Sequence, residues 1–393
     1  MIIKNKFNII SGKMLKIIIS KSFYILIALY SISAKAEDDL KYPFLSGDIL
    51  IENRSDHIYS RKTPNNLKTN NSFFYVENNS NLHINQFWQI KTNWRLQPNN
   101  VITTRNLEFP ERYRTILQNN RSIGMLDRMG LIAEEIKINF ENEDLTANIG
   151  KFDPTFGTAH FKSKKLGVFT RDFTEDYNLR EKIGGNLNIL LENSQISLNS
   201  FFNDTTPLSE SAINNRGQAS QNQAISGNNG NLSSYSVNLK TSKTLGFDNW
   251  FSNLGYRSLG VKHSLNSSRE FGMVLNSEYL WQYGKMSIVP FVELVKINNF
   301  TGEKDKNTLY STSAIMLRYS NWNMSGSFIN RNIKSKIKNY SISDYQAQIS
   351  VGYKFKNGFA IDLTRADIKE SSLNSVARKA SLIGANLSYL YKF

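Results

Sequence analysis

The sequence is poor in several features on which many folds and active sites depend. It has no cysteine, 7 prolines and 4 histidines among 393 residues. Without cysteine, disulfide cross-links and thiol chemistry are excluded, so stability has to come from the fold itself. The mean hydropathy is −0.41, and no stretch reaches the roughly 20 apolar residues of a membrane-spanning helix.

The chain begins with the pattern of a secretory leader. Basic residues precede an apolar run from Phe23 to Ser33, and the small-residue site Ala34-Lys35-Ala36 follows. This order predicts a signal peptide over residues 1–36 and a mature domain over residues 37–393, with Met14 as an alternative start. A retained anchor is the competing interpretation. Cleavage would remove six lysines and no acid, lowering the formal charge from +15 to +9.

The last stretch of the chain alternates between two kinds of side chain. One parity carries Ile383, Ala385, Leu387, Tyr389, Tyr391 and Phe393, and the other carries Gly384, Asn386, Ser388 and Lys392. Because successive side chains of a strand point to opposite faces, this pattern predicts a strand with one apolar and one polar face. It resembles the closing strand of outer-membrane β-barrels, whose terminal Phe is read by assembly machinery. An ordinary exposed strand is the alternative.

The same alternation recurs along the chain and predicts an all-β fold. In residues 131–142 the charged residue Glu134 falls on the apolar, lipid-facing parity. Such a position is acceptable only if Glu134 lies at the level of the lipid headgroups. The faces of 251–263 and 286–298 stay unassigned, since both parities are apolar there. The expected strands are 47–53, 72–77, 82–97, 131–142, 145–153, 182–191, 195–204, 233–246, 251–263, 270–283, 286–298, 308–320, 324–332, 344–356, 358–366 and 381–393.

The links between these strands alternate in length. Short links fall at 78–81, 141–144, 192–194, 247–250, 284–285, 321–323 and 356–358. Longer ones fall at 54–70, 98–130, 154–181, 205–232, 264–269, 299–307, 333–343 and 367–380. Counted back from Phe393, every short link lies on the periplasmic side. This predicts a transmembrane antiparallel up-and-down β-barrel of about 16 strands (14–18), with short periplasmic turns and long outer loops.

The expected strand number implies a water-filled lumen. Barrels of about eight strands are filled by side chains, whereas 16–18 strands leave a channel. The first strand begins about ten residues after the predicted cleavage site, so no N-terminal plug is expected. We therefore expect a porin that allows passive diffusion of small hydrophilic solutes through the outer membrane of a Gram-negative bacterium.

The third outer loop, 154–181, is the candidate for narrowing that lumen. Its basic and acidic groups facing one another would create a transverse field, although an ordinary solvated loop is equally consistent with the composition. The candidate constriction residues are His160, Lys162, Lys164, Lys165, Arg171, Asp172, Glu175, Asp176 and Arg180.

Charged side chains on the inward parity are the candidate pore lining. They are Lys91, Arg95, Glu135, Lys137, Lys182, Lys240, Glu278, Arg318, Lys354 and Asp362. The basic excess predicts a mild anion preference of a few-fold, since charges in a wide aqueous pore are screened.

Several segments resemble a family of bacterial porin-like outer-membrane proteins. The distinctive ones are GKFDPTFGTAH (150–160) and LGVFTRDFTEDYNLREKIGG (166–185), with weaker likeness in 200–209, 290–299 and 348–363. The resemblance implies a general diffusion channel whose third loop folds inward. The Lys-rich 162–165 stretch and the many Asn residues depart from the family pattern, which leaves solute preference open.

Other functions fit the sequence less well. A barrel enzyme needs a nucleophile with a positioned base, but His57, His83, His160 and His263 lie in separate segments without metal-ligand spacing. We expect no catalytic site, metal or cofactor, and no nucleic-acid partner. Outer-membrane lipid, lipopolysaccharide and the barrel-assembly machinery are the expected partners, and porins in general suggest a homotrimer. A non-conducting barrel whose surface loops bind a partner is the alternative function.

Overall fold

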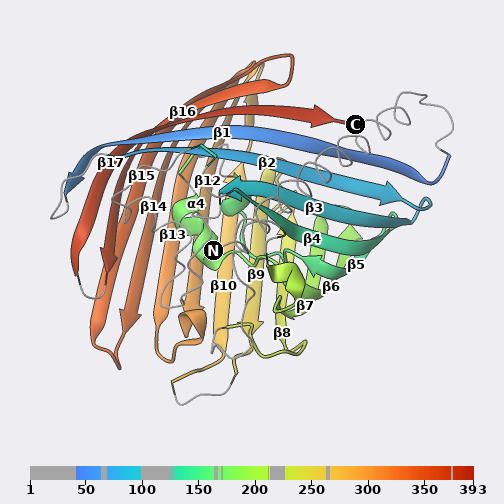
Figure 1. Cartoon of the computed structure of the whole chain (residues 1–393), viewed down its shortest axis with the longest axis horizontal. Coiled ribbons are helices and arrows are strands. Elements are labelled where there is room, and N and C mark those ends of the chain that lie inside the picture. The colour runs from blue at the N-terminus through green and yellow to red at the C-terminus, as the bar shows by residue number, and fades with distance from the viewer. Residues whose placement is uncertain are drawn as a thin grey trace, which may run out of the picture.

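The described residues form one antiparallel sheet that closes on itself into a barrel (Figure 1). The structure is a computed structural model that describes residues 41–62, 69–98, 125–126, 129–162, 167–169, 171–210, 212, 226–262, 266–372 and 375–393. The predicted signal peptide lies outside the described residues. No helix of the described chain is long and apolar enough to cross a membrane.

The barrel has sixteen strands, because two of the seventeen segments are halves of one interrupted strand. β10 (Glu270–Tyr279) and β11 (Trp281–Tyr283) flank Leu280 and both pair with β12 (Met286–Asn298). The other strands are β1 (Phe44–Lys62), β2 (Thr69–His83), β3 (Trp88–Pro98), β4 (Met129–Glu141), β5 (Leu145–Phe152), β6 (Lys182–Leu191), β7 (Ser194–Asn203), β8 (Ser234–Thr241), β9 (Trp250–Leu259), β13 (Asn307–Tyr319), β14 (Trp322–Ser335), β15 (Tyr340–Lys354), β16 (Phe359–Ser372) and β17 (Ser375–Lys392).

The closing strand joins the first one. β17 pairs with β1 from Asp48↔Lys392 onward, and Gly47 and Phe393 exchange backbone hydrogen bonds of 2.9 and 3.0 Å. A closed barrel leaves no edge strand, so every ladder group finds a partner within the sheet. The prediction of a closed antiparallel barrel of about 16 strands is therefore confirmed.

The outer face of the barrel carries the apolar parity of each strand. Exposed residues of this kind include Leu254, Met273, Ile315, Ile349 and Leu387. Aromatic pairs lie near the rim that holds the C-terminus, such as Trp322 with Tyr353 at 4.8 Å and Phe359 with Tyr389 at 4.6 Å. An apolar band edged by aromatic side chains is typical of barrels whose outer face meets lipid. Burial also assigns the faces of β9 and β12, which the sequence left open. Leu254 and Leu294 are exposed on the outward face, whereas Asn253 and Glu293 are buried on the inward face.

The first two strands are longer than the sequence predicts. Residues 54–62, expected in a loop, continue β1, where Arg54 and Asp56 form a 2.9 Å ion pair on the inward face and Ile58 is buried. The tight turn expected at 78–81 is also wrong, because these residues pair with β1 inside β2. The turn lies at 84–87 instead, where the Asn85 Oδ1 accepts from the backbone of Phe87 and Trp88. Polar residues resemble a turn locally, but here the barrel ladder and an inward polar face satisfy them.

Two outer links are also shorter than predicted. The loops expected at 333–343 and 367–380 reduce to 336–339, between β14 and β15, and to the two positions between Ser372 and Ser375. Apolar alternation ends where the apolar band ends, whereas strand pairing continues beyond it through polar residues such as Arg331 and Asp344. In Figure 1 the orange strands around β14 and β15 accordingly extend as a tall wall.

A β-bulge in β4 corrects the interpretation of Glu134. The register with β3 shifts between Asn93 and Trp94, so that Glu134 is the extra residue. A bulge re-aims a side chain, and the Glu134 carboxylate contacts Arg95 at 3.0 Å and also Arg180. Glu134 is therefore turned toward the polar interior and does not need a headgroup rim.

Candidate functional site

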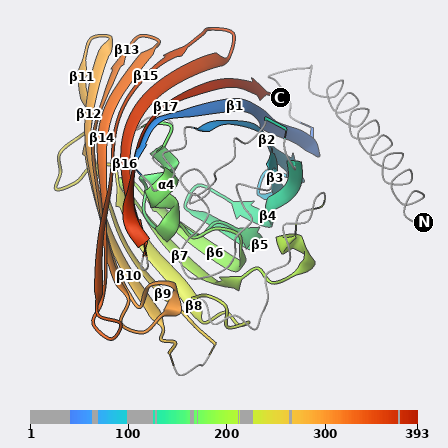
Figure 2. The same ribbon diagram turned by 60° about the vertical axis from the view of Figure 1, so that its left-hand side comes forward.

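The segment between β5 and β6 lies inside the ring of strands. It contains the short helices η2 (His160–Lys162), α4 (Arg171–Thr174) and η3 (Glu175–Tyr177). Figure 2, which views the barrel obliquely, shows α4 within the curve of the sheet. Residues 153–181 are therefore called the inner loop. Its contacts with the wall fix its position inside the barrel.

One buried carboxylate on β12 holds both ends of the inner loop. Glu293 accepts hydrogen bonds from the Thr158 backbone (2.5 Å) and hydroxyl (3.0 Å), from the Ala159 backbone (3.2 Å) and from the Tyr177 hydroxyl (2.7 Å). The Glu293 side chain is 1 % exposed. A carboxylate with several donors is a strong and directional acceptor, so Glu293 fixes the spacing between η2 and η3.

Two arginines of the wall bind the second half of the inner loop. Arg257 on β9 donates to the Tyr177 carbonyl at 2.5 Å, and its guanidinium lies 4.5 Å from the Phe156 ring centroid. Arg331 on β14 pairs with Asp176 at 2.7 Å and lies 4.5 Å from the Phe173 ring centroid. Each guanidinium thus combines a charge-assisted hydrogen bond with an aromatic contact.

The middle of the inner loop reaches the opposite part of the wall. The Val168 backbone donates to Thr364 Oγ1 (3.3 Å), and the Phe169 backbone donates to Gln348 Oε1 (3.2 Å). At Gly167, with φ +133°, an added Cβ would lie 2.5 Å from that Gln348 oxygen, so only glycine fits there. Arg54 lies 4.7 Å from the Phe169 ring centroid. The inner loop therefore spans from β12 to β15, β16 and β1.

Apolar side chains of the inner loop form a core inside the barrel. Phe156, Tyr177 and Leu179 pack with inward residues of the wall, including Phe201 and Val295. A second cluster joins Phe169 and Phe173 to Ile58, Ile329 and Leu382. These clusters fill part of the lumen and hold the loop in place by apolar burial.

The described charges of the inner loop are mostly paired at contact distance. His160 lies 3.0 Å from Glu175, and Lys162 lies 2.6 Å from Glu278 on β10. Arg180 contacts Glu134, Glu175 and Asp153 together. Instead of facing one another across open space, these charges largely cancel. Lys164 and Lys165 lie outside the described residues, and of Arg171 and Asp172 only the backbone, in α4, is described.

Two acids of the inner loop have perturbed proton affinities. Burial raises the pKa of Asp153 to about 7, with Arg180 opposing the change and Glu134 and Glu135 adding to it. Burial likewise raises the pKa of Asp176 to about 6, although Arg331 opposes it. Both groups therefore titrate near neutral pH, so the charge of the inner loop changes there.

The candidate pore-lining residues lie on the face opposite the apolar band, and several have neighbours there. Arg95 contacts Glu77 at 2.9 Å, Lys137 contacts Glu135 at 2.7 Å, and Lys91 contacts Glu141 at 3.5 Å. Lys182 donates to Asn203 Oδ1 at 2.5 Å. Glu278 pairs with Lys162 of the inner loop. The remaining four, Lys240, Arg318, Lys354 and Asp362, alternate with outward apolar residues such as Leu239, Leu317, Tyr353 and Leu363.

Carboxamides cover much of the remaining inward wall. Asn93 donates to Asn79 (2.6 Å), Asn148 donates to Asn186 (3.1 Å), and Asn186 donates to Asn199 (2.8 Å). Asn238 donates to the Thr155 hydroxyl of the inner loop at 3.1 Å. A carboxamide both donates and accepts hydrogen bonds without a net charge. Such a wall hydrates a lumen and favours neither sign of ion.

Sequence reasoning missed the wall residues that hold the inner loop. Glu293 and Arg257 lie on the two strands whose faces could not be assigned, and Arg54 lies in the predicted loop. The sequence did offer one signal, which is a charged residue within a strand whose two faces both carry apolar residues. Such a charge is expected to be buried, and charges are seldom buried without a partner. Among the described residues no group of three or more histidines and acids could hold a metal ion.

Comparisons with solved structures place this architecture among known barrels. The outer-membrane channel DcaP of Acinetobacter baumannii superposes with a TM-score of 0.53 at 9 % identity, over 88 % of this chain and 96 % of that one. OccAB3 of Acinetobacter baumannii gives a TM-score of 0.54 at 9 % identity, over 89 % and 99 %. The chain has the fold of outer-membrane channel barrels.

The same channel-barrel fold recurs in a loop-deletion mutant of OmpT, an outer-membrane protein of Vibrio cholerae. It superposes with a TM-score of 0.52 at 9 % identity, over 88 % of this chain and 99 % of that one. No protein-family model matches the sequence, and no curated protein matches it. The likeness therefore lies in the barrel and not in the residues.

Proposed function

We propose that the protein is a passive channel of the Gram-negative outer membrane for small hydrophilic solutes. The observation that carries this proposal is a closed barrel of sixteen strands with an apolar exterior and a carboxamide-rich, charged interior. A barrel of this size leaves a lumen. Solved barrels of the same fold include outer-membrane channels, which supports both the location and the activity.

The inner loop is proposed to narrow this lumen. It contacts Glu293, Arg257, Arg331 and Gln348, which belong to four different strands of the wall. A segment held at several points across the lumen reduces its cross-section without movement. We propose only a mild anion preference, because ion pairs cancel most described charges of the inner loop and salt screens the others.

Transport, and not catalysis, is the proposed activity, and the binding of outer-membrane lipid and lipopolysaccharide accompanies it. We also propose that residues 1–36 are cleaved as a signal peptide and that the assembly machinery recognises Phe393 at the end of β17. Residues 37–393 would then be the mature barrel, and several copies would associate in the membrane as a homotrimer.

Conductance under a salt gradient tests this function. The refolded mature chain, residues 37–393, is placed in a planar bilayer under a KCl gradient. We expect stepwise conductance with a small reversal potential on the anion side. An inserted, heat-modifiable barrel that never conducts would overturn the proposal and favour a structural or adhesive barrel whose outer loops bind a partner.

A further inference from the structure

A groove lies on the outward face of the barrel, near the rim that holds the C-terminus. It has a volume of about 460 Å³. Trp250 on β9, Tyr279 on β10 and Val292 on β12 line it from the outward parity of their strands. Phe247, from the turn between β8 and β9, closes one side, with its ring centroid 5.9 Å from that of Trp250. The groove therefore opens to the surroundings of the barrel and not to its lumen.

A proline interrupts the sheet at this groove. Pro290 of β12 lines the groove and has no backbone N–H, and prolines are rare in strands that are paired on both sides. Pairing between β10 and β12 stops after Glu278↔Phe291. It resumes at Trp281↔Ile288, which leaves the intervening positions without ladder pairing to β12. The groove thus has a cause in the sequence of β12.

The lining of the groove is largely aromatic and apolar. Trp281 is 55 % exposed and Val292 is 43 % exposed. The Trp250 Nε1 donates to Ser277 Oγ at 2.8 Å, so the polar atom of this indole is satisfied inside the groove. Trp and Tyr gather where the headgroups of a membrane meet its acyl chains. An apolar groove at this level is filled by hydrocarbon, because water is excluded from it.

The turn between β8 and β9 also presents apolar side chains beside the groove. It covers residues 242–249, and a bridge between Thr244 and Phe247 makes it a small hairpin. Leu245 lies at its tip with φ 52° and is 81 % exposed. Such a left-handed position favours Asn or Gly, and an exposed leucine there adds nothing to the core of the barrel. Contact with lipid accounts for a leucine at this position, since leucine is favoured in hydrocarbon.

Basic side chains lie at the rim end of the groove. Lys285 is exposed in the turn after β11, and Lys243 in the small hairpin lies 3.0 Å from Asp248. The short turns of outer-membrane barrels face the periplasm, and the leaflet on that side consists of phospholipid. Basic groups at the end of an apolar groove complement a lipid that carries a phosphate.

We propose that this groove binds one phospholipid of the periplasmic leaflet as a specific ligand. One acyl chain lies in the groove along Val292, with Phe247 beside it, and the phosphate faces Lys285 at the rim. The inference rests on the membrane location of the barrel and not on conduction. A barrel that never conducts could still bind this lipid, so the failure of the proposed channel function would be a separate result.

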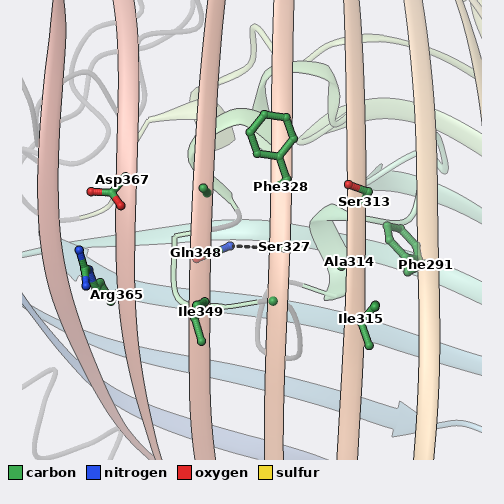
Figure 3. Close-up of a pocket in the computed structure, with 12 residues that line it drawn as sticks. Phe291, Ser313, Ala314, Ile315, Ser327, Phe328, Gln348, Ile349, Arg365 and Asp367 are labelled. Carbon is green, nitrogen blue, oxygen red and sulfur yellow. Dashed lines mark hydrogen bonds between the residues drawn. The ribbon is translucent and has the colours of Figure 1, made fainter.

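A second depression on the outward face lacks these features. Figure 3 shows it across β13–β16, with Phe328, Ile315 and Ile349 around it and Arg365 to one side. Its volume of about 570 Å³ is larger, but every residue that lines it belongs to a strand, so no turn closes it. Its lining also includes the charges of Arg365 and Asp367, which are unfavourable next to an acyl chain. It therefore serves as a control surface.

Filling the groove tests the site. The protein is extracted from outer membranes in mild detergent, and native mass spectrometry counts the phospholipids retained on each barrel. We expect one on the wild type and none on V292W, whose indole occupies the groove. The matched control L294W changes the next outward position of β12, which is 45 % exposed, and should keep the lipid. Equal retention by the two variants, or a wild-type barrel that carries no lipid or a second protein chain instead, would overturn the proposal.

Charge reversal tests the headgroup contact. K285E should lower the retained phospholipid about tenfold, because it places a carboxylate against the phosphate. K356E, exposed in the turn between β15 and β16 at the same rim, is the control and should keep the lipid. Equal retention by K285E and K356E would contradict the proposal, since the occupant would then be bound without its phosphate. Heat-modifiable migration on gels verifies that each barrel is folded.

Tryptophan fluorescence locates the occupant. The barrel is reconstituted with a phospholipid brominated on its acyl chains, which quench a tryptophan in contact with them, and is then diluted into detergent. Quenching should persist in the wild type and in W322F and should disappear in W250F/W281F. F328W, which places a tryptophan in the depression of Figure 3, should add fluorescence that is not quenched. Quenching that survives in W250F/W281F, or that extends to F328W, would place the lipid elsewhere and overturn the proposal.

Discussion

At the scale of single residues, buried charges hold the interior of this barrel in one arrangement. Glu134 joins Arg95 and Arg180, and Glu293 collects donors from both ends of the inner loop. Removal of one partner from such a group leaves the others desolvated and uncompensated, which is more damaging than the loss of an exposed ion pair.

Replacement of Glu134 by leucine should destabilise the barrel. Two buried guanidinium groups would lose a shared carboxylate, which is expected to lower the free energy of unfolding by about 3–5 kcal/mol. Urea unfolding of the protein in detergent, followed by tryptophan fluorescence, measures this change. The matched control is Glu143→Leu in the exposed turn between β4 and β5, which should have little effect. Equal stability of the two variants would show that the bulge does not depend on its carboxylate.

Replacement of Glu293 by glutamine should loosen the inner loop without unfolding the barrel. The amide nitrogen cannot accept a hydrogen bond, so at least one donor among Thr158, Ala159 and Tyr177 would be left unsatisfied, at a cost of about 1–3 kcal/mol. We expect more frequent closures and greater noise in single-channel currents. Glu192→Gln, in the exposed turn after β6, is the control. A quiet E293Q trace would mean that the other contacts suffice.

At the scale of elements, the inner loop and the strands around it have different sources of order. The strands are fixed by ladder hydrogen bonds and alternation, whereas the inner loop has only short helices and depends on the wall for its position. It can therefore be changed without loss of the barrel.

Shortening the inner loop should widen the channel. If residues 157–176 are replaced by a short glycine-serine linker, the single-channel conductance is expected to rise severalfold, because the lumen of a sixteen-strand barrel is otherwise open. Replacement of residues 336–339 by a tighter turn is the control, since this link lies between β14 and β15 at the outer rim. Unchanged conductance in the shortened variant would show that another element limits the flow.

At the scale of the whole molecule, the net charge inside the barrel depends on pH. Asp153 and Asp176 have pKa values of about 7 and about 6, above the ordinary range of an aspartate because burial disfavours the ionised form. When the pH falls through these values, both carboxylates lose their charge while Arg180 and Arg331 keep theirs. The lumen then becomes more positive.

The anion preference should therefore increase as the pH falls from about 8 to about 5. Reversal potentials under a fixed KCl gradient measure this change. In the double variant D153N/D176N the preference is expected to be higher at the upper pH and nearly constant across the same range. A wild-type preference that decreases with falling pH would contradict the assignment of these two acids as the titrating groups.

The sequence by itself determined the class of the fold. Alternation with a period of two residues is a local property, and it predicted the closed antiparallel barrel, the direction of β17 and the approximate strand number. It was reliable wherever one face meets an apolar environment and the other is polar, as in β6 and β10. It failed in 54–62 and 78–81, where both faces are polar and a turn and a strand look alike.

Only the tertiary structure decided which charges meet. Asp176 and Arg331 are 155 positions apart, and Glu293 and Thr158 are 135 apart. Their contact depends on the register of intervening strands and on the path of the inner loop, and neither is encoded in a local pattern. The bulge at Glu134 depends in the same way on pairing between strands. Alternation is set by neighbours in sequence, whereas ion pairs are set by neighbours in space.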